Sequence, residues 1–170
     1  MRSVILSGSI VILTSVSFFL FNAPSAPDIS SGTVTETVES TREAPETMLT
    51  KGAWKIQSVV SDKACDTDGD GATTTNIAAE MDACSLDDIM YIHPDGKVIF
   101  QRLERCSPDE AATEEYDWTL TSDNKFTITR GEAEAVMIFR HVSRDELVLV
   151  IPSEAQGEMY YFTVTYRRPG

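Results

Sequence analysis

The feature that most constrains the fold of this chain is a series of short segments in which apolar and polar residues alternate. Tyr116, Trp118 and Leu120 alternate with polar residues, and the pattern recurs at 126–129 and 160–166. A period of two places every second side chain on one face of a β-strand, so each segment can turn one face to a core. The pattern predicts strands at 53–60, 87–93, 97–104, 115–121, 125–130, 134–142, 146–152 and 158–168.

Tight turns separate these segments and join them as hairpins. In Pro94-Asp95-Gly96 the proline suits the first central position of a type I turn, and the glycine can take the left-handed conformation that follows it. Residues 76–83 could form a short helix, and no long helical pattern competes with the strands. Eight antiparallel strands within 51–170 predict an all-β, up-and-down barrel, which leaves no open sheet edge.

The first 50 residues lack the alternation and divide by composition. Residues 1–26 carry Arg2 as their single charge and an apolar run over 4–21, which is typical of a secretory signal peptide. An uncleaved N-terminal membrane anchor is the alternative, because the run just reaches the length needed to span a bilayer. Residues 27–50 are rich in Ser, Thr, Glu and Pro, which predicts a disordered linker. The folded domain is therefore expected at 51–170.

The chain is strongly acidic. It has 27 Asp and Glu against 14 Lys and Arg, which gives a formal net charge of −13. This charge repels phosphate backbones and argues against nucleic acid as a partner. It suits an exported protein of the periplasm, the cell envelope or the medium, in contact with a membrane only through the N-terminal segment. The sequence leaves the oligomeric state open.

The chain has three cysteines, Cys65, Cys84 and Cys106. If His93 pairs with Lys97 across the turn between them, the register places Cys84 opposite Cys106 at the open end of the hairpin. In an exported protein this favours a disulfide between the two. Two alternatives stay open: a bulge breaks the register before Cys106, or Cys65, otherwise a free thiol, exchanges into the pair with Cys84.

An acidic run lies between the first two expected strands. Asp66, Asp68 and Asp70 alternate and Gly71 follows, as in the first half of a calcium-binding loop. The bidentate glutamate that would close such a loop is replaced by Ile77, so another carboxylate must complete the set. In the alternative interpretation, Asp and Gly form a solvated turn. The expected Ca²⁺ ligands are Asp66, Asp68, Asp70, the carbonyl of Ala72, Thr74 and Glu80, with Asp82 or Asn76 in reserve.

No pattern of residues in the sequence points to catalysis. The two histidines, His93 and His141, have no partner at zinc-ligand spacing, and no nucleophile motif accompanies them. The acidic doublets 87–88 and 114–115 are interpreted as solvated strand ends. The sequence therefore predicts a binding protein and not an enzyme.

The two ends of the expected domain carry a third pattern. Gly52-Ala53-Trp54 opens the first strand, and Arg167 and Arg168 close the last. These strands are neighbours in a closed barrel, so a guanidinium could cover the Trp54 ring by a cation–π contact. An ordinary core tryptophan and a solvated basic end fit the residues equally well.

With these residues the chain resembles the lipocalins, and more fully the lipocalin-like domains of exported proteins from Bacteroidetes-type bacteria. The resemblance implies a small calyx-like barrel that binds a hydrophobic or amphiphilic ligand. It covers nearly all of 51–170. Its elements, in order, are Gly52-Ala53-Trp54, Asp66 to Gly71, Cys84 with Asp87-Asp88, Pro94-Asp95-Gly96, Cys106, Trp118 and Tyr166-Arg167-Arg168.

Two functions follow as hypotheses. In the first, the barrel interior binds a small apolar ligand, with the acidic loop stabilised by calcium. In the second, the domain is a cell-envelope adhesion module that binds a protein or a glycan through calcium-ordered loops. The expected cavity residues, which could equally be core, are Tyr116, Trp118, Phe126, Met137, Phe139, Tyr160 and Phe162.

Overall fold

The computed structural model describes residues 43–155 and 157–170. Three short helical elements and nine strands make up this part of the chain. The helical elements are α1 (Pro45–Leu49), the 3-10 turn η1 (Ile77–Ala79) and α2 (Ala83–Leu86). The strands are β1 (Ala53–Cys65), β2 (Thr74–Asn76), β3 (Ile89–Ile92), β4 (Lys97–Gln101), β5 (Thr113–Leu120), β6 (Lys125–Arg130), β7 (Ala133–Val142), β8 (Glu146–Ala155) and β9 (Glu158–Arg167).

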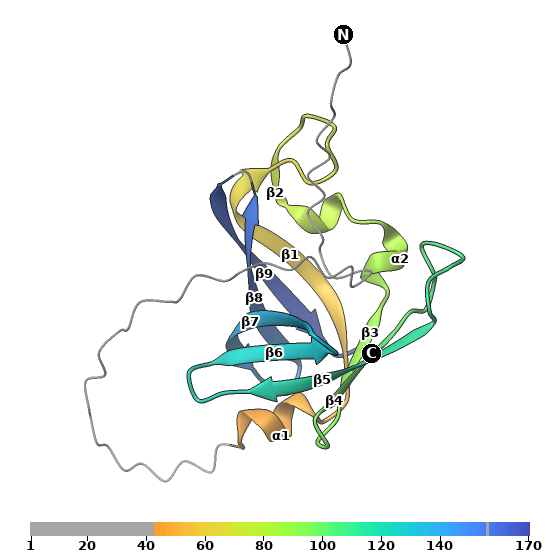
Figure 1. Cartoon of the computed structure of the whole chain (residues 1–170), viewed down its shortest axis with the longest axis vertical. Helices are drawn as coiled ribbons and strands as arrows, with labels where there is room; N and C mark the ends of the chain where they lie inside the picture. The colour runs from red at the N-terminus through yellow and green to blue at the C-terminus, as the bar shows by residue number, and fades with distance from the viewer. Residues whose placement is uncertain (1–42, 156) are drawn as a thin grey trace, which may run out of the picture.

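The strands form a closed antiparallel barrel (Figure 1). Strands β3 to β9 pair each with the next, β1 pairs with β3 at one end, and β9 returns to pair with β1. The closing register runs from Lys55↔Arg167 to Ser61↔Phe162. The short β2 pairs only with the far part of β1 and stands outside the ring of eight. The expected all-β, eight-stranded, up-and-down barrel is therefore confirmed.

The barrel has two distinct ends. We call the end that carries α1 and the β3–β4 turn the base, and the opposite end, which carries β2, η1 and α2, the mouth (Figure 1). At the base, Gly96 has a φ of 86° and its N–H donates to the carbonyl of His93 at 3.2 Å, as the predicted turn requires. The long segment 66–88 that joins β1 to β3 lies at the mouth.

The linker prediction was wrong for its last residues. Residues 45–49 lie inside the range 27–50, and they fold into α1 instead of remaining extended. Leu49 is fully buried, and its carbonyl accepts a hydrogen bond of 2.9 Å from Trp54 Nε1. The expected signal segment and the rest of the linker lie outside the described residues. Composition missed α1 because one buried leucine on a short helix is too weak a signal against many polar neighbours.

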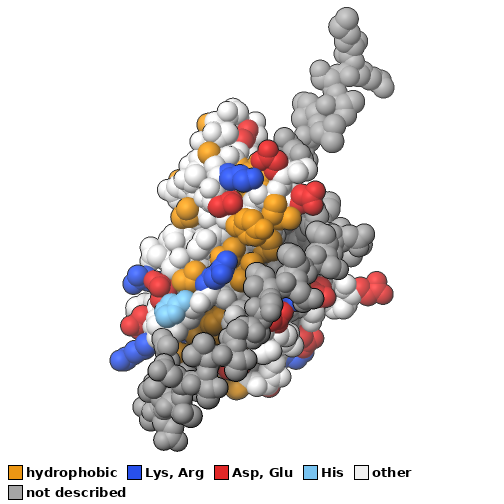
Figure 2. Space-filling model, turned by 90° about the vertical axis from the view of Figure 1, so that its left-hand side faces the viewer, with side chains coloured by type: hydrophobic (Ala, Val, Ile, Leu, Met, Phe, Trp, Pro, Cys, Tyr) orange, Lys and Arg blue, Asp and Glu red, His pale blue; other side chains and the backbone are white. Residues whose placement is uncertain are grey.

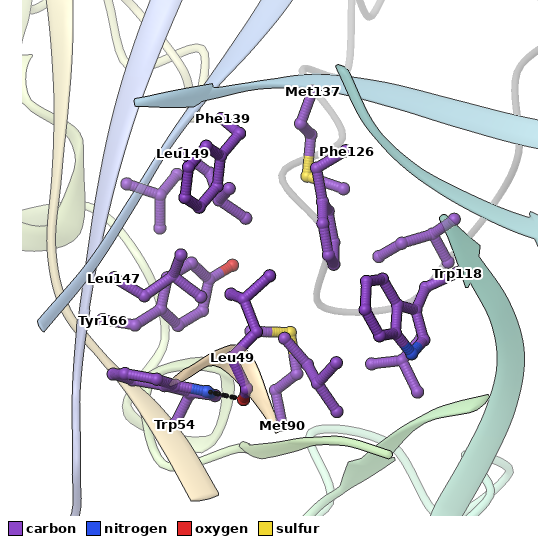
Figure 3. Close-up of a cluster of buried hydrophobic side chains, with 14 of the residues drawn as sticks. Leu49, Trp54, Met90, Trp118, Phe126, Met137, Phe139, Leu147, Leu149 and Tyr166 are labelled. Carbon is purple, nitrogen blue, oxygen red and sulfur yellow. Dashed lines mark hydrogen bonds between the residues drawn. The ribbon is translucent and has the colours of Figure 1, made fainter. Parts of the chain in front are cut away.

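The base half of the interior is filled by side chains. Trp54, Trp118 and Tyr166 point toward one another from β1, β5 and β9 (Figure 3). Arg168 lies 4.1 Å from the centre of the Trp54 ring, so the expected cation–π contact is present. Trp54 thus joins β1 to α1 through Leu49 and to the end of the chain through Arg168, and these contacts close the base.

The mouth is held by a disulfide between Cys84 and Cys106, as the hairpin register predicted. The paired register runs from Ile89↔Gln101 to Ile92↔Val98, and Cys84 lies beyond it on α2. The two Cα atoms lie 5.4 Å apart. Cys65 is a buried free thiol at the end of β1. The bond joins the end of the covering segment 66–88 to the loop that follows β4.

Apolar side chains also occur on the outside of the barrel. Val60, Val136 and Tyr161 are exposed, and apolar atoms show between acidic and basic ones in Figure 2. Among the described residues, no helix is both long and apolar enough to cross a membrane.

Candidate functional site

The barrel interior is the first candidate site. All seven expected cavity residues lie on inward-facing strand positions, but six of them are buried against other side chains. Trp118 and Phe126 stack with ring centres 5.7 Å apart at the base. Phe126 and Met137 are 0% and 1% exposed, so no water-sized space adjoins them. In the base half, these inward residues are therefore core, and their role as ligand contacts stays a prediction.

The mouth half of the interior is less tightly enclosed. Phe100, Ile151 and Tyr160 pack against the core and remain partly accessible. Tyr160 and Phe162 stack with ring centres 6.4 Å apart on β9. Register places Ile151 opposite Phe162 on β8. We call Ile151, Tyr160 and Phe162 the apolar side of the mouth.

The segment 66–88 lies over the mouth, beyond the ends of the barrel strands. Ile77 on η1 is fully buried, and Ala78 and Met81 pack against the same core. The segment contacts the barrel through β1 and is anchored at its far end by Cys84. It thus adds apolar side chains to the core and pairs with the barrel only through the short β2.

The opposite side of the mouth carries an ion-pair cluster that the sequence interpretation missed. The Arg102 side chain is 4% exposed. Its Nη2 lies 3.2 Å from a Glu114 oxygen, its Nε lies 3.8 Å from Glu110, and its Nη1 donates to the carbonyl of Ala111. Arg130 joins through Glu114 at 3.6 Å. A guanidinium this deeply buried is stable only with such partners.

Tyr116 connects this cluster to the aromatic core. Its hydroxyl donates a hydrogen bond of 2.8 Å to Glu114 and accepts one of 3.4 Å from Arg130. Arg130 also lies over the Tyr116 ring, 5.3 Å from its centre. Burial, together with the hydrogen bond to Glu114, raises the pKa of Tyr116 to about 12. The hydroxyl therefore stays a proton donor at any ordinary pH.

Asp88 completes the cluster. In the described part of the chain, its Oδ1 is buried and makes no hydrogen bond. Burial raises the pKa of Asp88 to about 6, although the charge of Arg102 opposes the shift. Asp87, Glu110 and Glu114 add to the rise through their negative charges.

The interpretation of both acidic doublets as solvated strand ends was therefore half wrong. Asp88 and Glu114 face inward, whereas Glu115 is exposed on the outer face beside Lys97. The signal was present in the register. If the pairing of the β3–β4 hairpin is continued beyond Ile89↔Gln101, Arg102 falls opposite Asp88. On the next strand, Glu114 pairs with Phe100.

The acidic loop is a second candidate site. Single oxygens of Asp66, Asp68 and Asp70 all lie within 4.8 Å of one another, so the three could hold a metal ion. The same carboxylates shape the loop by accepting backbone N–H groups: Asp66 accepts from Gly69 at 2.7 Å, and Asp70 accepts from Ala72 at 2.7 Å. Backbone bonds to carboxylates are typical of both calcium loops and plain turns.

The other expected calcium ligands are placed less closely. Glu80 comes to the loop, where its carboxylate accepts a hydrogen bond from the Thr67 hydroxyl. The hydroxyl of Thr74 accepts from the N–H of Asn76 at 3.0 Å. Ala72 follows the cluster, with its N–H bonded to Asp70. Glu80 is thus the carboxylate nearest to completing the set.

The remaining polar groups are dispersed. His93 lies at the base beside the β3–β4 turn, and His141 is exposed on β7, so the two are not brought together. A shallow pocket of about 340 Å³ lies outside the barrel at the base, lined by Glu43, Met48, Lys51, Arg144 and Arg168. It is far from the mouth and shares none of the predicted site residues.

The comparisons with known proteins bear on the fold only. No family model matches the chain. A search of curated proteins also finds no match. Bovine odorant-binding protein with its natural ligand matches at 14% identity and a TM-score of 0.44, over 78% of each chain. Its complex with undecanal gives 13% and 0.43, again over 78% of each chain. The protein from bovine nasal mucosa gives 15% and 0.41 over the same shares. The barrel assignment rests on the strand pairing described above.

Proposed function

We propose that the protein is an exported binding protein that holds a small hydrophobic or amphiphilic molecule in the mouth half of its barrel. The observation that carries this proposal is the difference between the two halves of the interior. Trp54 and Phe126 at the base are fully buried, while Phe100, Ile151 and Tyr160 remain partly accessible under a separate covering segment. Ligand sites are typically apolar and concave, with a few fixed polar groups.

The arrangement suits binding. The ligand would lie on the apolar side of the mouth, with Met81 of segment 66–88 above it. Methionine adapts its shape easily, so it suits a surface that must open for a ligand and close without one. The disulfide and the signal-like N-terminus support export, because such bonds persist in oxidising compartments.

Fluorescence titration tests the proposal. We expect the full chain to bind the neutral apolar probe N-phenyl-1-naphthylamine with enhanced emission. Ile151→Gln should weaken binding at least tenfold, because it leaves an amide in an apolar site. Val136→Gln is the matched control, since Val136 is exposed on the outer face. Absence of probe binding, or equal loss in both variants, would contradict the proposal.

We further propose that the acidic loop binds Ca²⁺ and thereby orders the segment that covers the mouth. The support is the convergence of Asp66, Asp68 and Asp70 and the approach of Glu80. Calcium at ten times its dissociation constant should stabilise the fold by about 1.4 kcal/mol, or about 5 °C in Tm. Calorimetry with CaCl2 measures this shift.

Two variants separate this site from general charge effects. Asp68→Ala should abolish the calcium-dependent rise in Tm, while Asp109→Asn, which removes an exposed carboxylate outside the loop, should keep it. An equal rise in all three proteins would overturn the calcium proposal. If calcium binds and no small molecule does, the adhesion module with calcium-ordered loops becomes the better function.

A further inference from the structure

The mouth of the barrel is chemically two-sided. Its apolar side comes from β8 and β9, and its polar side is the ion-pair cluster on β3 to β6. The inward-facing positions of these four strands end in Asp88, Arg102, Glu114 and Arg130. Tyr116 stands opposite Arg130 by register, and ion pairs and hydrogen bonds join it to the others on the same side of the mouth. A site that binds only a hydrocarbon chain would gain no affinity from these charged groups.

The charge of the cluster indicates which head group it fits. Three carboxylates, on Asp88, Glu110 and Glu114, face two guanidiniums, on Arg102 and Arg130. Arg102 is already paired with Glu114 and lies near Glu110. Asp88 keeps a buried oxygen that no described residue donates to. The cluster therefore has one negative charge and one acceptor to spare.

The residues around the ion-pair cluster are also mostly acidic. The segments 62–88, 102–115 and 130–134, which build the mouth end, carry fifteen Asp and Glu against four Lys and Arg. Such a field raises the local concentration of cations and repels anions. A cationic head would approach along the field and meet the acceptor at its end.

We propose that the mouth recognises an amphiphile with a protonated amine head, held by Asp88 and Glu114, while its apolar chain lies against Ile151, Tyr160 and Phe162. The inference rests on the proposed function and adds the chemical class of the ligand. Burial holds the pKa of Asp88 above its ordinary value, although the charge of Arg102 opposes the shift. An ammonium group supplies both the charge and the missing donors.

Isothermal titration calorimetry with three ligands of equal chain length tests the proposal on the full chain. Decylamine should bind at least about tenfold more tightly than decanol, since hydrogen bonds to charged groups contribute that much. Decanoic acid should bind more weakly than decanol. Equal affinities, or a preference for the acid, would overturn the amine assignment and leave the apolar site standing. If none of the three binds, the proposed function fails as well.

Variants assign the effect to the cluster. Asp88→Asn should remove most of the preference for decylamine over decanol and leave the affinity for decanol unchanged. Asp87→Asn is the matched control, because it removes the same charge from the neighbouring residue, whose carboxylate accepts a hydrogen bond from the N–H of Glu104. Arg130→Gln acts in the opposite direction and should strengthen decylamine binding, since it removes a competing cation from Glu114. A preference unchanged in both Asp88→Asn and Arg130→Gln would refute the role of the cluster.

Discussion

Arg168 closes the base of the barrel by joining three parts of the chain. Its guanidinium covers the Trp54 ring at 4.1 Å, its Nη2 donates to the carbonyl of Met48 at 3.0 Å, and its Nε donates to the carbonyl of Arg144. The first contact lies on β1, the second on α1 and the third in the turn between β7 and β8. Arg168→Ala removes all three contacts at once.

The expected loss follows from these contacts. A cation–π contact at a partly exposed site contributes about 1 kcal/mol. Each hydrogen bond to a carbonyl contributes about 1 kcal/mol net. Arg168→Ala should therefore lower the free energy of unfolding by about 3 kcal/mol, a large part of the roughly 5–15 kcal/mol of a typical domain. Arg168→Lys keeps the positive charge but loses the planar guanidinium group. It should therefore recover only about a third of the free energy of unfolding that Arg168→Ala loses.

Urea unfolding followed by tryptophan fluorescence measures the loss. Arg167→Ala is the matched control, because Arg167 is exposed and only forms a surface ion pair of 3.3 Å with Glu146. Such pairs contribute about 0–1 kcal/mol, so this variant should unfold close to the parent. The reasoning is refuted if Arg168→Ala costs no more than Arg167→Ala.

Two further predictions concern the mouth and the base. Burial raises the pKa of Asp88 from 3.8 to about 6, so the fold favours the protonated form of this carboxyl group. Its ionisation should therefore lower the free energy of unfolding increasingly as pH rises from about 4 to 7. Urea unfolding should therefore show Asp88→Asn to be more stable than the parent at pH 7 and equal to it below pH 4; equal stabilities at both values would contradict the assignment. Leu49→Ala should cost about 2–5 kcal/mol, because Leu49 is fully buried, whereas exposed Thr47→Ala should be nearly neutral in thermal unfolding. Similar losses in these two variants would show that α1 does not dock.

Local patterns in the sequence were enough to predict the barrel. The repeating pattern of short segments and tight turns identified all eight of its strands. Several of them showed clean alternation, because a strand with one buried face repeats every two residues whatever surrounds it. The turn at Gly96 set the register of the β3–β4 hairpin, and that register predicted the Cys84–Cys106 bond. The short β2 and the extension of β1 to Cys65 were missed, since both depend on contacts within segment 66–88.

The candidate site was predictable in part. The acidic loop was visible because its three aspartates are adjacent in sequence, and the structure keeps them together. The ion-pair cluster was missed because its members come from four strands and the doublets were judged by composition alone. Extending the register that paired the cysteines would have placed Arg102 opposite Asp88.

The sequence by itself determined the class of fold, the register of one hairpin and the acidic character of the protein, since each depends on residues close together in the chain. Only the tertiary structure decided which inward residues are core and which line the mouth. Exposure depends on how far each strand extends beyond the packed base and on what segment 66–88 covers. Tertiary packing also gave α1 its role, because Leu49 is buried only when β1, β9 and the base side chains are already in place.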